Sequence, residues 1–236
     1  MSLGFEVKYD GQDLMVNGHN MKDETATRVF AEGLVPMTVG SVIRGIVFSL
    51  HNWFDQDSCV RRSRFVDQIS YQMGDLAGSI AVDAYYNDMT RQKNYKKLGA
   101  AIGAVVGSTF EDSKSVKNFI PSPSSLGSNI GGSAASWMLN DMYAAKLHAA
   151  RGFGQQAGLY IGLKVEPWLP QLSSSNSQLR IQISGVFGAN IVAACVAPNK
   201  KTRDFYLRQA VFDGIIPNRT LSRMALSKYY RYYRLL

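Results

Sequence analysis

Three glycines spaced four residues apart constrain the fold of residues 98–107 more than any other feature of the sequence. The segment reads LGAAIGAVVG, and Gly99, Gly103 and Gly107 share one face if it is helical. Because glycine has no side chain, that face lets a second backbone approach closely. Such stripes also occur in membrane-inserting segments, but the apolar run 98–106 is only nine residues long, and a bilayer span needs about 20. The spacing therefore favours close helix packing within a soluble fold or assembly.

The first 150 residues combine a short β-hairpin with helical patterns. Apolar and polar residues alternate over 5–9 and 14–16, and an Asp-Gly turn signal lies between the two runs. Apolar residues then recur at three- and four-residue steps, which predicts helices. These helices are expected over 23–32, 39–50, 58–89, 96–107 and 134–151.

The second half of the chain predicts strands followed by helices. Strict alternation over 159–165 and 179–184 predicts paired strands, whereas 186–197 fits a strand or a buried helix equally well. Threonines before 203–212 and 221–233 predict capped helices there. The expected fold is α+β and helix-dominated, with an N-terminal β-hairpin, a small antiparallel sheet in the second half and two C-terminal helices.

Composition at two places suggests how the chain is organised. The length of 236 residues suits one domain covering 1–236. The Ser-, Gly- and Pro-rich stretch 121–136 predicts an extended loop and a possible subdomain junction. Residues 198–236 hold nine of the 26 basic residues but only two of the 18 acidic ones. The excess positive charge thus gathers in a basic C-terminal helical module, while the rest of the chain is nearly neutral.

The basic module predicts an anionic partner. Clustered cations attract polyanions, and tyrosines can stack on bases while arginines pair with phosphates. A solvated helix face with packed tyrosines is the alternative. The candidate nucleic-acid-binding residues are Lys200, Lys201, Arg203, Arg219, Arg223, Lys228, Arg231, Arg234, Tyr230 and Tyr233.

Local signatures of catalysis, metal binding and cofactor binding are missing from the sequence. It contains no phosphate-binding loop, no His-Glu-x-x-His motif and no Gly-x-Ser-x-Gly motif. The two cysteines, Cys59 and Cys195, lack metal-ligand spacing. We therefore predict no catalytic residue, metal or cofactor. An enzyme with a non-local site near His51 and Cys59 remains a third hypothesis.

Two hypotheses about function thus come before the enzyme. The first is a structural nucleic-acid-associated or self-assembling protein, resembling a nucleocapsid or coat subunit in role, that binds RNA or another single strand. The second is a non-catalytic component of a secretion or membrane-associated machine that docks on an acidic protein or membrane surface. The sequence has no secretory signal and no run of about 18 apolar residues. We expect a homo-oligomer without a transmembrane span, in the cytoplasm or a virion.

Overall fold

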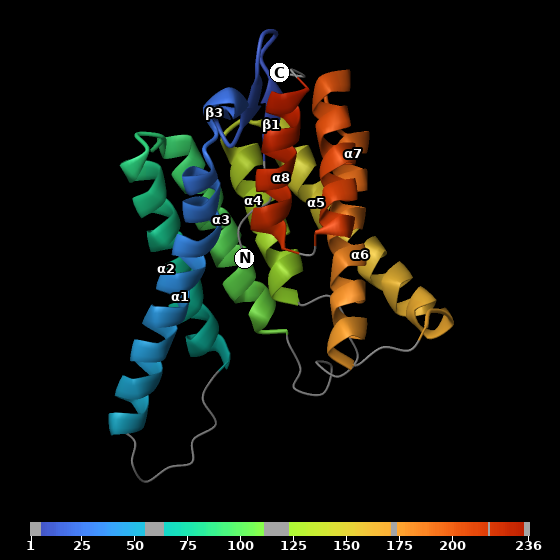
Figure 1. Cartoon of the computed structure of the whole chain (residues 1–236). Coiled ribbons are helices and arrows are strands. Elements are labelled where there is room, and N and C mark those ends of the chain that lie inside the picture. Colours follow the sequence, from blue (N-terminus) through green and yellow to red (C-terminus); the bar gives the residue numbers. More distant parts are fainter. Residues whose placement is uncertain (1–5, 55–63, 111–122, 171–173, 217, 234–236) are drawn as a thin grey trace.

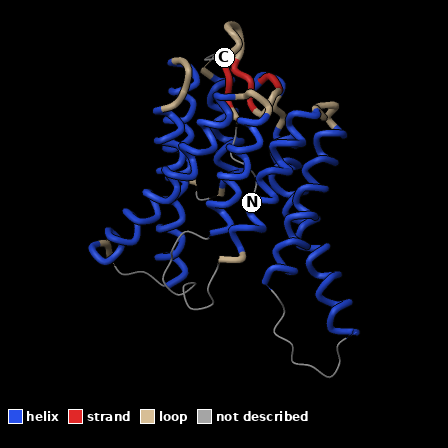
Figure 2. The backbone as a smooth tube through the Cα atoms, turned by 180° about the vertical axis from the view of Figure 1, so that it is seen from behind, coloured by secondary structure: helices blue, strands red, loops and turns tan. Residues whose placement is uncertain are grey.

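The N-terminal β-hairpin is confirmed and gains a third strand. The computed structural model describes residues 6–54, 64–110, 123–170, 174–216 and 218–233. Strands β1 (Val7–Tyr9), β2 (Leu14–Val16) and β3 (His19–Asn20) form one antiparallel sheet in the order β1-β2-β3. Gly11 and Gly18 make the turns at φ values of 105° and 89°, which suit glycine. The sheet lies at one end of a helical bundle (Figures 1 and 2).

Six helices form three successive antiparallel hairpins. Each hairpin packs tightly along its length, and Figure 1 shows the three side by side below the sheet. The pairs are α1 (Ala26–Phe54) with α2 (Arg64–Tyr85), α3 (Arg91–Ser108) with α4 (Pro123–Met138), and α5 (Met142–Val165) with α6 (Ser174–Cys195).

Glycines bring the helices of every hairpin close together. A Cβ placed on Gly103 of α3 would lie 2.0 Å from the carbonyl oxygen of Gly127 in α4. A Cβ on Gly158 of α5 would lie 2.1 Å from the carbonyl oxygen of Ser184 in α6, and one on Gly74 of α2 would meet the backbone of α1. The predicted close packing of the stripe at 99, 103 and 107 is confirmed, and the same device recurs in the other two hairpins.

The last two helices close the bundle into a ring. Helix α7 (Lys200–Ile215) packs on α6, and α8 (Arg219–Tyr232) packs on α7 and returns to α1. Their N-caps are Asn199 and Asn218, each one residue before the helix. Each helix thus contacts the next along the chain, and the eighth contacts the first (Figure 1).

The hydrophobic core lies at the sheet end of this ring. Phe205, Tyr206 and Tyr230 are buried there against Val7 and Leu147. The Val7 N–H donates to the Tyr206 hydroxyl at 3.1 Å. The core therefore joins the sheet to α5, α7 and α8.

Two predictions for the second half of the chain are wrong. Residues 159–165 and 179–184 belong to α5 and α6, so the second sheet does not exist there. The alternation misled because both helices are mostly apolar around their circumference, and a short window on such a helix looks like a strand. The expected loop at 121–136 is instead largely α4, whose small residues fit closely against α3. The helices expected over 23–32 and 39–50 are one helix in the structure, because α1 continues through Pro36.

Candidate charged cavity

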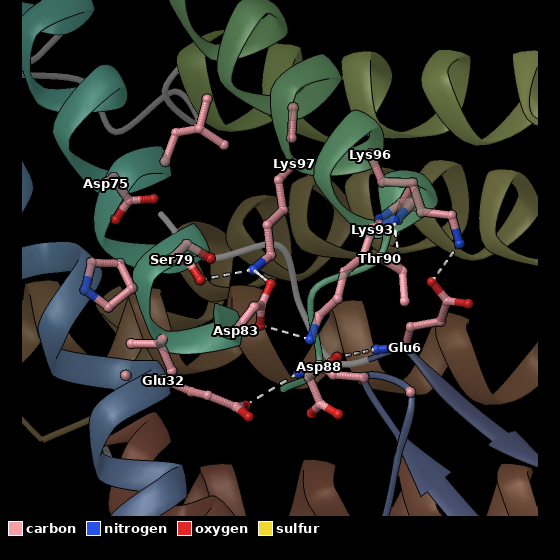
Figure 3. Close-up of a pocket in the computed structure, with 18 of the residues that line it drawn as sticks. Glu6, Glu32, Asp75, Ser79, Asp83, Asp88, Thr90, Lys93, Lys96 and Lys97 are labelled. Carbon is pink, nitrogen blue, oxygen red and sulfur yellow. Dashed lines mark hydrogen bonds and ion pairs between the residues drawn. The ribbon is translucent and has the colours of Figure 1, made fainter. Parts of the chain in front are cut away.

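The helices line a cavity of about 410 Å³ that is open to solvent and has charged walls. Its lining comes from the sheet and from helices α1 to α5, α7 and α8. Seven acidic and seven basic side chains contribute to it, together with His148. Figure 3 shows many of them pointing toward one another across the space between α2, α3 and the sheet. Most belong to one of three ion-pair clusters or to a fourth, more cationic group.

The first cluster fixes the sheet to the start of α3. Lys96 Nζ lies 2.9 Å from Glu6 Oε2 and 2.6 Å from Asp141 Oδ2, and Figure 3 shows the contact with Glu6. Lys8 Nζ reaches the same two carboxylates, at 2.8 Å and 3.0 Å. Burial by itself would raise the pKa of Glu6 and Asp141. The hydrogen bonds and charges of the two lysines outweigh it and hold both pKa values below the ordinary range.

The second cluster joins α2 to α3. The buried carboxylate of Asp83 accepts from Lys93 Nζ at 2.7 Å and also from Lys97. Lys97 donates in addition to the backbone oxygen of Ser79 at 3.2 Å. These contacts place two ammonium groups and one carboxylate along one wall of the cavity (Figure 3).

The third cluster connects the N-terminal segment, α1 and α8. Arg223 Nη1 lies 2.8 Å from Glu32 Oε2, and Arg223 Nη2 pairs with Glu24. Arg28 pairs with Asp88 and lies 3.0 Å from Glu32 through its Nε. Burial tends to raise the pKa of Glu24, but His19 and Arg223 leave it lowered. The cluster therefore neutralises its buried charges internally.

The fourth group lies where α5, α7 and α8 meet the cavity. Arg151, Arg219 and His148 line it, together with the carboxylate of Asp213. Asp213 accepts from Asn190 and Gln209, both at 2.7 Å, and from the Ser222 hydroxyl. Burial raises the pKa of Asp213, whereas the pKa values of Glu6, Glu24 and Asp141 in the other clusters are lowered.

The structure divides the predicted nucleic-acid-binding residues into two sets. Lys200, Lys201, Arg203, Lys228, Arg231 and Tyr233 are exposed, whereas Arg223 and Tyr230 are each 3 % exposed. Arg223 belongs to the third cluster and Tyr230 packs on Phe205 in the core, whereas Arg219 is exposed and also lines the cavity. Arg234 and the proposed reactive Cys59 lie outside the described residues.

Sequence reasoning missed most of the cavity-lining residues. Neither Lys96 nor Asp83 belongs to a recognisable sequence motif. The available signal was the presence of isolated charges in otherwise apolar or glycine-rich helices, such as Arg151 in α5.

No group of three or more His, Cys, Asp or Glu side chains suited to a metal ion occurs within the described ranges. Searches of protein-family models, curated proteins and solved structures found nothing that matches the chain.

Proposed function

We propose that this chain is a membrane-embedded helical bundle that holds a polar ligand in its charged cavity. The observation that carries the proposal is an inverted distribution of polarity. Charged residues such as Asp83, Lys96 and Arg151 are buried inside the ring, while large apolar side chains are exposed on its outside. Large contiguous apolar surfaces mark sites of interaction with proteins or membranes.

The outer face of the central hairpin supports this proposal. On α3, the glycine face contacts α4, and Leu98, Ile102 and Val106 form an exposed stripe at four-residue spacing. Ile102 and Val106 are 55 % and 53 % exposed. The sequence carries no charged residue from 98 to 110 or from 123 to 140. In a bilayer, such an apolar surface contacts lipid tails and needs no partner protein to cover it.

Helix α1 extends the same apolar surface. In the described part of the chain, the segment Ala26–Leu50 is long and apolar enough to cross a membrane. A core helix of a soluble protein can pass the same test, but only 11 % of the tested window is buried here. Arg44 interrupts the segment, and its guanidinium pairs with Asp67 of α2 at 2.6 Å. The proposal thus departs from the expectation of no transmembrane span and develops the hypothesis of a membrane-associated component.

The arrangement of the helices also suits a bilayer. Small residues at every fourth position let helices approach closely where no hydrophobic effect drives them together. Polar side chains in membrane bundles face the interior and pair with one another, as Asp83 of α2 does with Lys93 and Lys97 of α3. The sheet and the C-terminal module would then form the part of the molecule outside the bilayer.

Vesicle flotation of the purified full chain tests the proposal. We expect the wild type to float with phosphatidylcholine vesicles and to resist extraction by alkaline carbonate and high salt. Ile102→Glu should reduce the floating fraction strongly, because a carboxylate at membrane depth costs about 2.5–3.5 kcal/mol. Tyr232→Glu, at an exposed aromatic near the sheet end of α8, is the matched control and should float like the wild type.

Two results would overturn the proposal. One is a wild-type chain that stays monomeric in detergent-free buffer and ignores vesicles. The other is a discrete detergent-free oligomer that Ile102→Glu dissociates, which would assign the apolar face to a second copy of the chain.

A further inference from the structure

One end of the cavity carries more positive than negative charge. Arg151 of α5 and Arg219 of α8 both line it, and Asp213 is the carboxylate near both guanidinium groups. This differs from the third cluster, where Arg223 alone contacts two carboxylates, Glu24 and Glu32. Asp213 is thus influenced by both guanidinium groups at this end.

That acid is already engaged by neutral groups. The carboxylate of Asp213 accepts from the Asn190 amide, the Gln209 amide and the Ser222 hydroxyl. These three contacts fix Asp213 in the wall and occupy much of its acceptor capacity. Among the described residues, Arg219 forms no hydrogen bond or ion pair, although its side chain is accessible from the cavity.

The surroundings of Arg219 disfavour its charge in the empty cavity. Desolvation at the cavity wall and the charge of Arg151 lower the pKa of Arg219 to about 10, so this exposed side chain still carries its proton at neutral pH. Arg219 is also the first residue of α8, a helix of 14 residues whose N-terminus adds positive potential there. An anion between the two guanidinium groups would relieve this repulsion.

We propose that the cationic end of the cavity, at Arg151 and Arg219, binds the phosphate group of a polar ligand. Guanidinium groups pair with phosphate through two parallel hydrogen bonds, and helix N-termini favour the same group. The cavity volume of about 410 Å³ is within the range of small-molecule sites. The balanced ion pairs along the rest of the wall suit a polar remainder of the ligand. The inference rests on the proposed function in one respect. A phosphate can belong to a soluble metabolite or to a lipid headgroup, and which of the two reaches this site depends on whether the chain lies in a membrane.

Thermal unfolding and calorimetry on the full chain, kept monodisperse in mild detergent, test this inference. One arm uses inorganic pyrophosphate, and the other compares short-chain phosphatidic acid with short-chain phosphatidylcholine. We expect pyrophosphate, phosphatidic acid or both to bind and raise Tm, and phosphatidylcholine to do neither. Binding of pyrophosphate alone indicates a soluble source of the phosphate, and binding of phosphatidic acid alone indicates a lipid.

Matched variants locate the site. Arg219→Gln should weaken binding tenfold or more, whereas Lys228→Gln, which removes the same charge from an exposed position on α8, should change it less than twofold. If Arg219→Gln does not fold, Arg219→Lys keeps the charge without the planar fork and should weaken binding at least threefold. The inference is overturned if neither phosphate probe binds the wild type, or if the variants at 219 and 228 lose affinity equally.

The two proposals can fail separately. A chain that ignores vesicles but binds pyrophosphate through Arg219 refutes the membrane proposal alone. A chain that floats with vesicles but binds neither probe refutes the phosphate site alone.

Discussion

Arg223 and Glu24 form a buried ion pair across 199 residues of sequence. Arg223 lies on α8, near the end of the chain, and Glu24 follows the N-terminal sheet. Arg223 also contacts Glu32 on α1. Its guanidinium group therefore links α8 both to the segment that follows the sheet and to the α1–α2 helical hairpin. A residue that sequence composition assigned to nucleic-acid binding is thus placed where it stabilises the ring.

Loss of Arg223 should therefore destabilise the protein strongly. Arg223→Leu removes the arginine partner of buried Glu24 and leaves Glu32 with Arg28 alone, and breaking a buried ion pair typically costs about 3–5 kcal/mol. The exposed Arg231 on the same helix is the control, and Arg231→Leu should change the free energy of unfolding by less than about 0.5 kcal/mol. Urea unfolding followed by circular dichroism measures both. Equal stability of the two variants would show that the ion pair contributes little.

The glycine contacts predict opposite effects for one substitution at two sites. In Gly103→Ala the new methyl group would lie 2.0 Å from the Gly127 carbonyl oxygen, so the α3–α4 hairpin must separate, at a cost of about 1–3 kcal/mol. In Gly45→Ala on α1 nothing lies within 4 Å of the new methyl group. That variant should gain up to about 1 kcal/mol from helix propensity. Thermal unfolding compares them, and two shifts of the same sign would contradict the close packing.

Acid should weaken the attachment of the sheet to the helices. The pKa values of Glu6, Glu24 and Asp141 are all lowered in the folded protein, because nearby lysines, His19 and Arg223 outweigh the effect of burial. A carboxylate with a lowered pKa adds stability above its unfolded pKa and loses it as pH falls. We expect Tm to stay nearly constant from pH 7 to about 5 and then to fall below about pH 4.5. Asp141→Asn should lower Tm at pH 7 and flatten the fall, and an unchanged acid profile in this variant would exclude Asp141 as a contributor.

The local parts of the fold could be predicted from sequence because their causes are local. The Asp-Gly turn predicted the first hairpin, and the four-residue glycine spacing predicted a close helix contact at Gly103. The strands expected at 159–165 and 179–184 failed because alternation over a few residues does not distinguish a strand from a helix that is apolar on several sides.

The cavity could not be predicted, because its contacts join distant parts of the chain. Glu6 meets Lys96 across 90 residues, and Arg223 meets Glu32 across 191 residues. Because Arg219 and Arg223 lie in the basic C-terminal module, the sequence predicted that both belong to a cationic surface. It could not show that the folded chain buries Arg223 and places Arg219 at the edge of the cavity, since that depends on the ring closing at α1 and α8.

Nucleic-acid binding by the C-terminal module stays a prediction, and the structure limits it to the exposed cations. Lys200, Lys201, Arg203, Lys228 and Arg231 remain accessible, so any affinity for single-stranded RNA should be weak and should fall steeply with salt. Replacing Lys200 and Lys201 by Gln should lower the slope of log K against log salt by about 1.4, because each phosphate contact on a single strand contributes about 0.7. Fluorescence anisotropy with a labelled oligonucleotide measures the slope. Lys93→Gln removes a cation from the cavity wall, so RNA affinity that falls as much in this control as in the lysine variant would contradict the assignment to the outer surface.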